Sequence, residues 1–208
     1  MTLRMLVAIG LGAALAGCTA YREATSPGMD ASLPWRRIAT DVDRTKLRNW
    51  RTAWSEALPL ARAADAKRID GDPALFDPDR AQADAMPPAG DYRCRTVKLG
   101  GGGTAVAAIV TYDWRPCAVR DDGKVRHFRI EGGVQRPDGN IFPDVTARAT
   151  FLGTLEVGDD NAPFRYGMDN KRDVIGYAER IGDKRWRLVL PYPSFESKLD
   201  VIEIVPAV

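Results

Sequence analysis

The spacing of apolar residues changes once along the chain. Between residues 35 and 66, apolar side chains recur every three or four positions, which is typical of one face of an amphipathic helix. Thr40, with Asp43 three residues later, is suited to cap the start of this helix, and Pro59 predicts a kink or a restart. We expect the apolar face to pack against the rest of the protein. Its residues are Leu47, Trp50, Trp54, Ala57, Leu58 and Ala61.

From Gly90 onward the period is two. Short alternating runs are separated at regular intervals by Gly, Pro, Asn and Asp, which predicts the antiparallel strands of a barrel or a sandwich. Asp138-Gly139 predicts a hairpin turn, and in the run after Lys184 we expect Trp186, Leu188 and Leu190 to point inward. The expected strands cover residues 91–99, 104–114, 124–131, 133–136, 141–142, 147–157, 164–166, 173–181, 185–190 and 199–205, and Pro116 ends the second of them.

These patterns predict an α+β protein that is mainly antiparallel β. Residues 90–208 form a barrel-like or sandwich β domain, and an N-terminal amphipathic helix packs on it. Residues 34–89 comprise the helical segment and a connector rich in Asp-Pro pairs, which ends at Pro87-Pro88.

The N-terminus has the features of a signal peptide over residues 1–17. A short positive start precedes an apolar run over residues 5–16 that is too short to span a bilayer. Leu15-Ala16-Gly17-Cys18 resembles the lipobox of bacterial lipoproteins, which implies a mature chain that begins at a lipidated Cys18; an ordinary secretory signal is the alternative. Residues 18–33 then form a tether. Thr19, where an Asp would favour the inner membrane, points to the periplasmic face of the outer membrane of a Gram-negative bacterium.

Charge and cysteine content narrow the function. The formal net charge is only +2 and Arg is scattered among acids, so we do not expect nucleic acid as a partner. If lipid consumes Cys18, then Cys94 and Cys117 remain as a pair in an oxidising compartment. Neighbouring strands 91–99 and 104–114 would bring them together as a disulfide; a redox or zinc site is the alternative. No metal or cofactor is expected, since His127 is the single histidine.

Two short stretches carry resemblances to known families. Gly90 to Arg95 and Arg185 to Ile202 resemble a proteobacterial lipoprotein family called domain of unknown function 4893, with a likeness from about residue 35 to residue 206. That family has no assigned activity, so no catalytic residue is carried over. Gly90-Asp91-Tyr92 also resembles, with Tyr in place of Trp, the first strand of calycins. This second likeness implies a small antiparallel barrel in which Arg187 packs over Tyr92.

A set of catalytic residues is not evident. His127 lies in the middle of an expected strand, and the glycine run at residues 100–103 lacks the Lys and the helix start of a phosphate-binding loop. Glu196 and Asp200 are the most plausible pair of carboxylates. The candidate binding residues are aromatic and charged side chains near the two family-like stretches: Tyr92, Arg95, Trp186, Arg187 and Glu196.

The sequence therefore favours a non-enzymatic, lipid-anchored envelope lipoprotein. We expect it to contact the membrane through its N-terminal lipid and to bind an envelope protein or a small ligand. A carboxylate-dependent periplasmic hydrolase and a purely structural envelope component are the alternatives. Two carboxylates roughly 5–10 Å apart in a wet cleft would favour the hydrolase. A barrel mouth lined by aromatic residues and Arg would favour binding.

Overall fold

A single antiparallel sheet of nine strands forms the centre of the molecule. The computed structural model describes residues 34–101, 106–160 and 162–207. The strands are β1 (Gly90–Leu99), β2 (Ile109–Thr111), β3 (Arg115–Asp122), β4 (Val125–Ile130), β5 (Gln135–Val145), β6 (Arg148–Val157), β7 (Asp173–Gly182), β8 (Arg185–Pro191) and β9 (Leu199–Pro206). From β3 to β9 each strand pairs with its neighbour in sequence, and β2 pairs only with the C-terminal end of β1.

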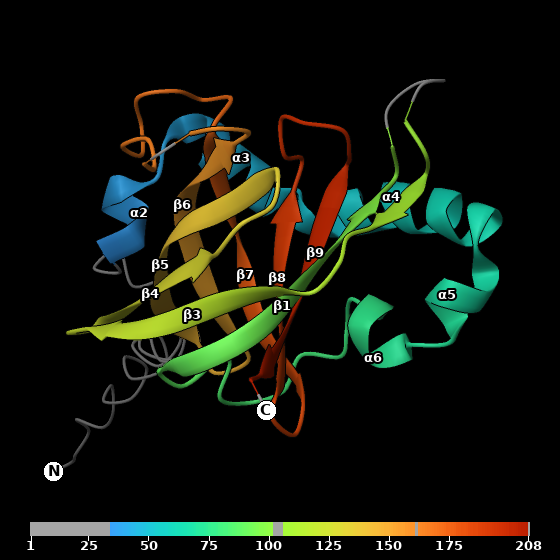
Figure 1. The fold of residues 1–208 in the computed structure, drawn as a ribbon, viewed down its shortest axis with the longest axis horizontal. Helices are drawn as coiled ribbons and strands as arrows, with labels where there is room; N and C mark the ends of the chain where they lie inside the picture. Colours follow the sequence, from blue (N-terminus) through green and yellow to red (C-terminus); the bar gives the residue numbers. More distant parts are fainter. Residues whose placement is uncertain (1–33, 102–105, 161, 208) are drawn as a thin grey trace, which may run out of the picture. The chain divides into compact units, whose positions relative to one another are not determined.

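The sheet closes on itself through β1 and β9. These strands pair continuously from Tyr92 opposite Pro206 to Leu99 opposite Leu199, while β1 also pairs with β3 through its N-terminal half. The result is an eight-stranded up-and-down barrel made of all strands except β2 (Figure 1). The expected mainly antiparallel fold is thus confirmed as a barrel, and the sandwich is not formed.

Five helices precede the barrel in the described residues: α2 (Pro34–Ile38), α3 (Asp41–Arg48), α4 (Trp50–Ala64), α5 (Ala66–Asp70) and α6 (Pro73–Phe76). Thr40 caps α3 as expected, because its side-chain oxygen accepts a hydrogen bond from the backbone N–H of Asp43. The expected restart at Pro59 is wrong. Pro59 lies inside α4, and the break in the helical run falls at Asn49 instead. None of these helices is long and apolar enough to cross a bilayer.

Alternation along the strands separates an inner core from two outer ones. Phe128, Phe151 and Leu188 belong to the cluster inside the barrel. The next residues along two of these strands, Leu152 and Val189, pack outside it, against α2–α3 and α4–α6 respectively. Figure 1 shows α4 crossing the outer face of β8 and β9, and α3 lies against β7. The predicted packing of the amphipathic helix on the β domain is confirmed.

The hairpin expected around Pro137-Asp138-Gly139-Asn140 is wrong. These residues lie within the continuous strand β5, where Gly139 pairs directly with Gly153 of β6. A Cβ atom on Gly139 would lie 2.3 Å from the carbonyl oxygen of Leu152. The absence of a side chain at Gly139 therefore allows β5 and β6 to approach closely. In the sequence, a glycine with this role looks the same as a glycine in a turn.

Two further segments differ from their expected form. The strand expected over residues 104–114 is formed only at β2 among the residues described, and Pro116, which was expected to end it, lies inside β3. Residues 164–166 form no strand. Instead, the Tyr166 hydroxyl accepts a hydrogen bond from the Thr40 backbone N–H and donates one to Asp43, and so completes the cap of α3 from a distant loop.

Candidate ligand-binding site at one end of the barrel

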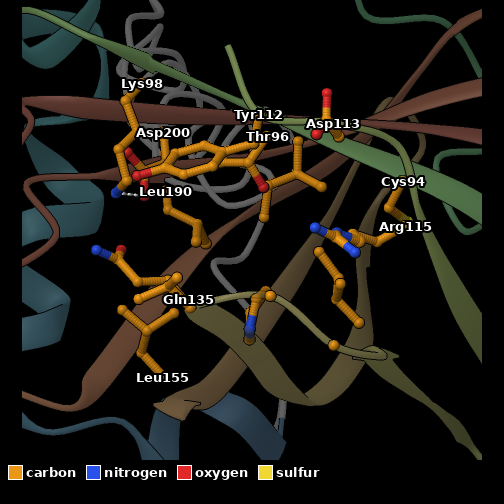
Figure 2. Close-up of a pocket in the computed structure, with 16 residues that line it drawn as sticks. Cys94, Thr96, Lys98, Tyr112, Asp113, Arg115, Gln135, Leu155, Leu190 and Asp200 are labelled. Carbon is orange, nitrogen blue, oxygen red and sulfur yellow. Dashed lines mark hydrogen bonds and ion pairs between the residues drawn. The ribbon is translucent and has the colours of Figure 1, made fainter. Parts of the chain in front are cut away.

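One end of the barrel contains a cavity of about 110 Å³ that opens to solvent. Its floor is apolar and includes the disulfide-bonded Cys94, whereas its wall and rim carry polar and charged side chains (Figure 2). The apolar members are Ile130, Pro137, Leu155, Leu190 and Ile202, with Val134 at the exposed rim. The polar members are Thr96, Lys98, Tyr112, Asp113, Arg115, Gln135 and Asp200.

Strand alternation explains why charged side chains enter this end. Cys94 and Lys98 lie four positions apart on β1 and share its inner face, and Asp200 and Ile202, two positions apart, do so on β9. Lys98 lies directly opposite Asp200 in the pairing of β1 with β9. The period of two therefore forces this pair into the barrel.

Lys98 and Asp200 form a buried ion pair. Lys98 Nζ lies 2.8 Å from Asp200 Oδ2, and the two side chains are 3% and 4% exposed. The other carboxylate oxygen of Asp200 accepts a hydrogen bond from the Ser197 hydroxyl. Burial raises the pKa of the Asp200 carboxyl above its ordinary value, while Lys98 opposes that shift by favouring the ionised form. Both carboxylate oxygens of Asp200 therefore have partners within the protein, one in Lys98 and the other in Ser197.

Glu196 spans the mouth of the cavity from the loop between β8 and β9. Its Oε2 accepts hydrogen bonds from the Tyr112 hydroxyl (3.3 Å) and from Gln135 Nε2 (3.1 Å), and it lies 4.0 Å from Lys98 Nζ. Burial, followed by the charge of Glu196, raises the pKa of Tyr112. Glu196 also has a φ of 68°, in the left-handed region that non-glycine residues rarely adopt. Backbone strain of this kind accumulates at functional sites.

Arg115 enters the cavity from the opposite side. It pairs with Cys94 across β1 and β3, so the two residues share the inner face. Figure 2 shows its guanidinium directed into the cavity, across from Lys98 and Asp200. Arg115 belongs to none of the ion pairs formed by the described residues.

The sequence-predicted binding residues are spread over three places. Glu196 lies at the cavity mouth. Tyr92 and Trp186 pack edge to face, 6.0 Å apart, at the other end of the barrel interior, where the Tyr92 hydroxyl donates to the Pro88 carbonyl. That end is covered by the connector, because Ala85 and Met86 pack onto the same inner cluster.

Arg95 and Arg187 lie on the outer face. Arg95 pairs with Glu203 at 2.6 Å and stacks over Trp114. Arg187 is fully buried against Glu179, so the contact with Tyr92 that the calycin likeness implied is not made.

The cysteine pairing is confirmed. Cys94 and Cys117 form a disulfide between β1 and β3, with their Cα atoms 5.8 Å apart. The residues expected to form the signal peptide and the tether, Cys18 among them, lie outside the described residues. Within the described ranges no three His, Cys, Asp or Glu side chains gather in a way that could hold a metal ion. His127 contacts Asn140 and Asp138 away from the cavity.

The sequence did not identify six of the polar residues that line the cavity, namely Thr96, Lys98, Tyr112, Asp113, Arg115 and Gln135. Lys98 could have been found, because it shares the period-two face of Tyr92 and Cys94. Arg115, Tyr112 and Gln135 carried no signal, since their strands begin or end elsewhere than expected.

Comparison with known proteins gives one result. No curated protein and no solved structure matches the chain. A family model described as domain of unknown function DUF4893 matches residues 35–204. That range spans the helices and nearly all of the barrel, and the eight-stranded barrel is consistent with a calycin-like architecture. The chain therefore belongs to the DUF4893 family.

Proposed function

We propose that this protein is a lipid-anchored envelope lipoprotein that binds a small ligand at the open end of its barrel, without catalysing a reaction on it. The observation that supports binding most directly is the cavity itself. It combines an apolar floor with a few convergent polar groups, which is the usual composition of a small-molecule site. The aromatic Tyr112 and the charged Arg115 at its wall match the features expected of a binding mouth.

The volume limits what can enter. An engineered apolar cavity of roughly 150 Å³ binds benzene, and the cavity here, at about 110 Å³, is somewhat smaller. The ligand therefore inserts a short alkyl chain or a group no larger than a single ring, and the rest of it remains at the mouth. Because few atoms are buried, an isolated fragment should bind with a Kd on the order of millimolar.

Titration of the protein with hexanol, followed by nuclear magnetic resonance, tests this proposal. We expect saturable shifts at Leu155, Leu190 and Ile202, whose side chains form the floor. Thr96→Leu, which adds volume at a half-buried lining position, should abolish them. Thr111→Leu, at an exposed position on β2, is the matched control and should bind normally. Shifts that do not saturate, or that persist in Thr96→Leu, would count against a binding cavity.

The anchor is proposed from the lipobox-like sequence around Cys18. Intact-protein mass spectrometry on material extracted from membranes should show a mature chain that starts at Cys18 and carries acyl mass. Cys18→Ala should lose both that mass and membrane association, because acyl chains supply the affinity at about 0.8 kcal/mol per buried methylene. A wild-type chain cleaved at another position, or free of lipid, would contradict the anchor and the envelope location.

Carboxylate-dependent hydrolysis is less well supported. Glu196 and Asp200 do lie near each other, since both approach Lys98 Nζ. However, Asp200 is buried, and its two oxygens are bonded to Lys98 and Ser197, so neither is available to activate water. The arrangement fits a fixed wall of a binding site better than a general acid or base.

A further inference from the structure

Arg115 stands out in the cavity because, among the residues that the structure describes, no carboxylate forms an ion pair with its guanidinium. The nearby carboxylates of Asp200 and Glu196 interact with other side chains. Asp200 is paired with Lys98, and Glu196 accepts hydrogen bonds from Tyr112 and Gln135 at the opposite side of the mouth. These residues come from β1, β5, β9, the segment that follows β2 and the loop before β9, whereas Arg115 itself lies on β3.

Asp113 is the one other acid among the described lining residues. It lies at the rim, and no oxygen of it approaches the Arg115 guanidinium closely enough to form an ion pair. In Figure 2 its carboxylate lies apart from the guanidinium. The charges of the cavity are therefore separated: the Arg115 guanidinium lies on one side, the Lys98–Asp200 ion pair and Glu196 lie on the other, and Asp113 lies at the rim.

We propose that Arg115 binds the anionic group of an amphipathic ligand whose short apolar part occupies the floor of the cavity. This assignment rests on the proposed binding function and specifies the class of ligand. A planar guanidinium offers paired N–H donors that match a carboxylate or a phosphate. The apolar floor lies beside it, so one molecule can reach both. Glu196 lies across the mouth from Arg115, and its negative charge would repel the anionic group of a ligand that placed this group beside Glu196 instead of Arg115.

Hexanol and hexanoate share the same apolar chain and differ in charge, so their comparison isolates Arg115. We expect the wild-type protein to bind hexanoate about tenfold more tightly than hexanol, as a charge-assisted hydrogen bond implies. Arg115→Gln should remove this preference and leave hexanol binding unchanged. Arg120→Gln, an exposed position on the same strand whose partner Asp91 lies outside the cavity, is the control and should keep the preference. Hexyl phosphate, titrated in parallel, distinguishes a phosphate ester from a carboxylate as the preferred anion.

Each outcome separates the two proposals. Equal affinity of the wild-type protein for hexanol and hexanoate, or an unchanged preference in Arg115→Gln, would overturn the role of Arg115 and leave the cavity as a binding site. Absence of binding by hexanol and by both anions would overturn the proposed function, and the role of Arg115 with it. Loss of the preference in Arg115→Gln alone supports both.

Discussion

Glu179→Ala is expected to lower the free energy of unfolding by about 3–5 kcal/mol, because it leaves a buried charge without its partner. Glu179 and Arg187 have no exposed side-chain surface and are joined at 2.7 Å. Arg187 also donates to the Leu75 carbonyl of α6 and lies over the ring of Trp54 in α4. The pair therefore connects two helices to the barrel wall. Urea denaturation with a two-state fit measures the difference in the free energy of unfolding between the wild-type protein and Glu179→Ala.

Two further variants test the cause. Asp70→Ala breaks the exposed pair with Arg62 and should cost less than about 0.5 kcal/mol. Replacing both buried partners, as Glu179→Leu with Arg187→Met, removes the two fully buried charges, leaves only the partly exposed Arg148 without its contact to Glu179, and should recover much of the stability. A cost below about 1 kcal/mol for Glu179→Ala would mean that Arg187 finds sufficient compensation from the carbonyl groups of α6 alone.

Phe151→Ala is expected to cost about 3–5 kcal/mol by opening a cavity inside the barrel. Phe151 is fully buried on β6 and packs edge to face with Phe128 of β4, with 6.0 Å between ring centroids. A loss of this size is a substantial fraction of the stability of a typical domain. Thermal and urea unfolding of the variant would measure it.

A double-mutant cycle separates the aromatic contact from simple burial. The combination of Phe151→Ala with Phe128→Ala should cost less than the two single changes together, with a coupling of about 0.5–1.5 kcal/mol. Val145→Ala, at a largely exposed position at the end of β5, is the control and should change stability by less than about 0.5 kcal/mol. Strict additivity of the two Phe variants would show that the rings contribute only through buried area.

The sequence pattern predicted the barrel walls better than their turns. Alternation placed Trp186, Leu188 and Leu190 inside the barrel, as observed, and the helical stripe correctly put Trp54 against the β domain. Gly139 was assigned to a turn, because a glycine that permits close strand packing looks the same in sequence as one that reverses the chain. The alternation of apolar and polar residues predicts which face of a strand a residue occupies, but it does not predict which strands pair with each other.

The candidate site was predictable only in part, for the same reason. Glu196 was identified from its charge, but its partners are far away in sequence: Tyr112 directly follows β2, and Gln135 begins β5. Arg115 was overlooked because Pro116 was expected to end a strand, whereas β3 begins at Arg115 and places it on the same face of the sheet as Cys94. A site assembled from several strands requires the register of each of them, and register follows from closure of the barrel.

The seam between β1 and β9 sets the order in which this fold can be completed. Before β9 is synthesised, β1 and β8 each present an unpaired edge, and such edges are prone to join other chains. The contacts that close the seam link opposite ends of the β domain and have the largest sequence separation of any strand pairing in the barrel, so closure should be slower than formation of the hairpins. The growing polypeptide thus remains vulnerable to aggregation until its final strand is available, and a factor that shields these edges in the meantime would raise the yield of folded protein.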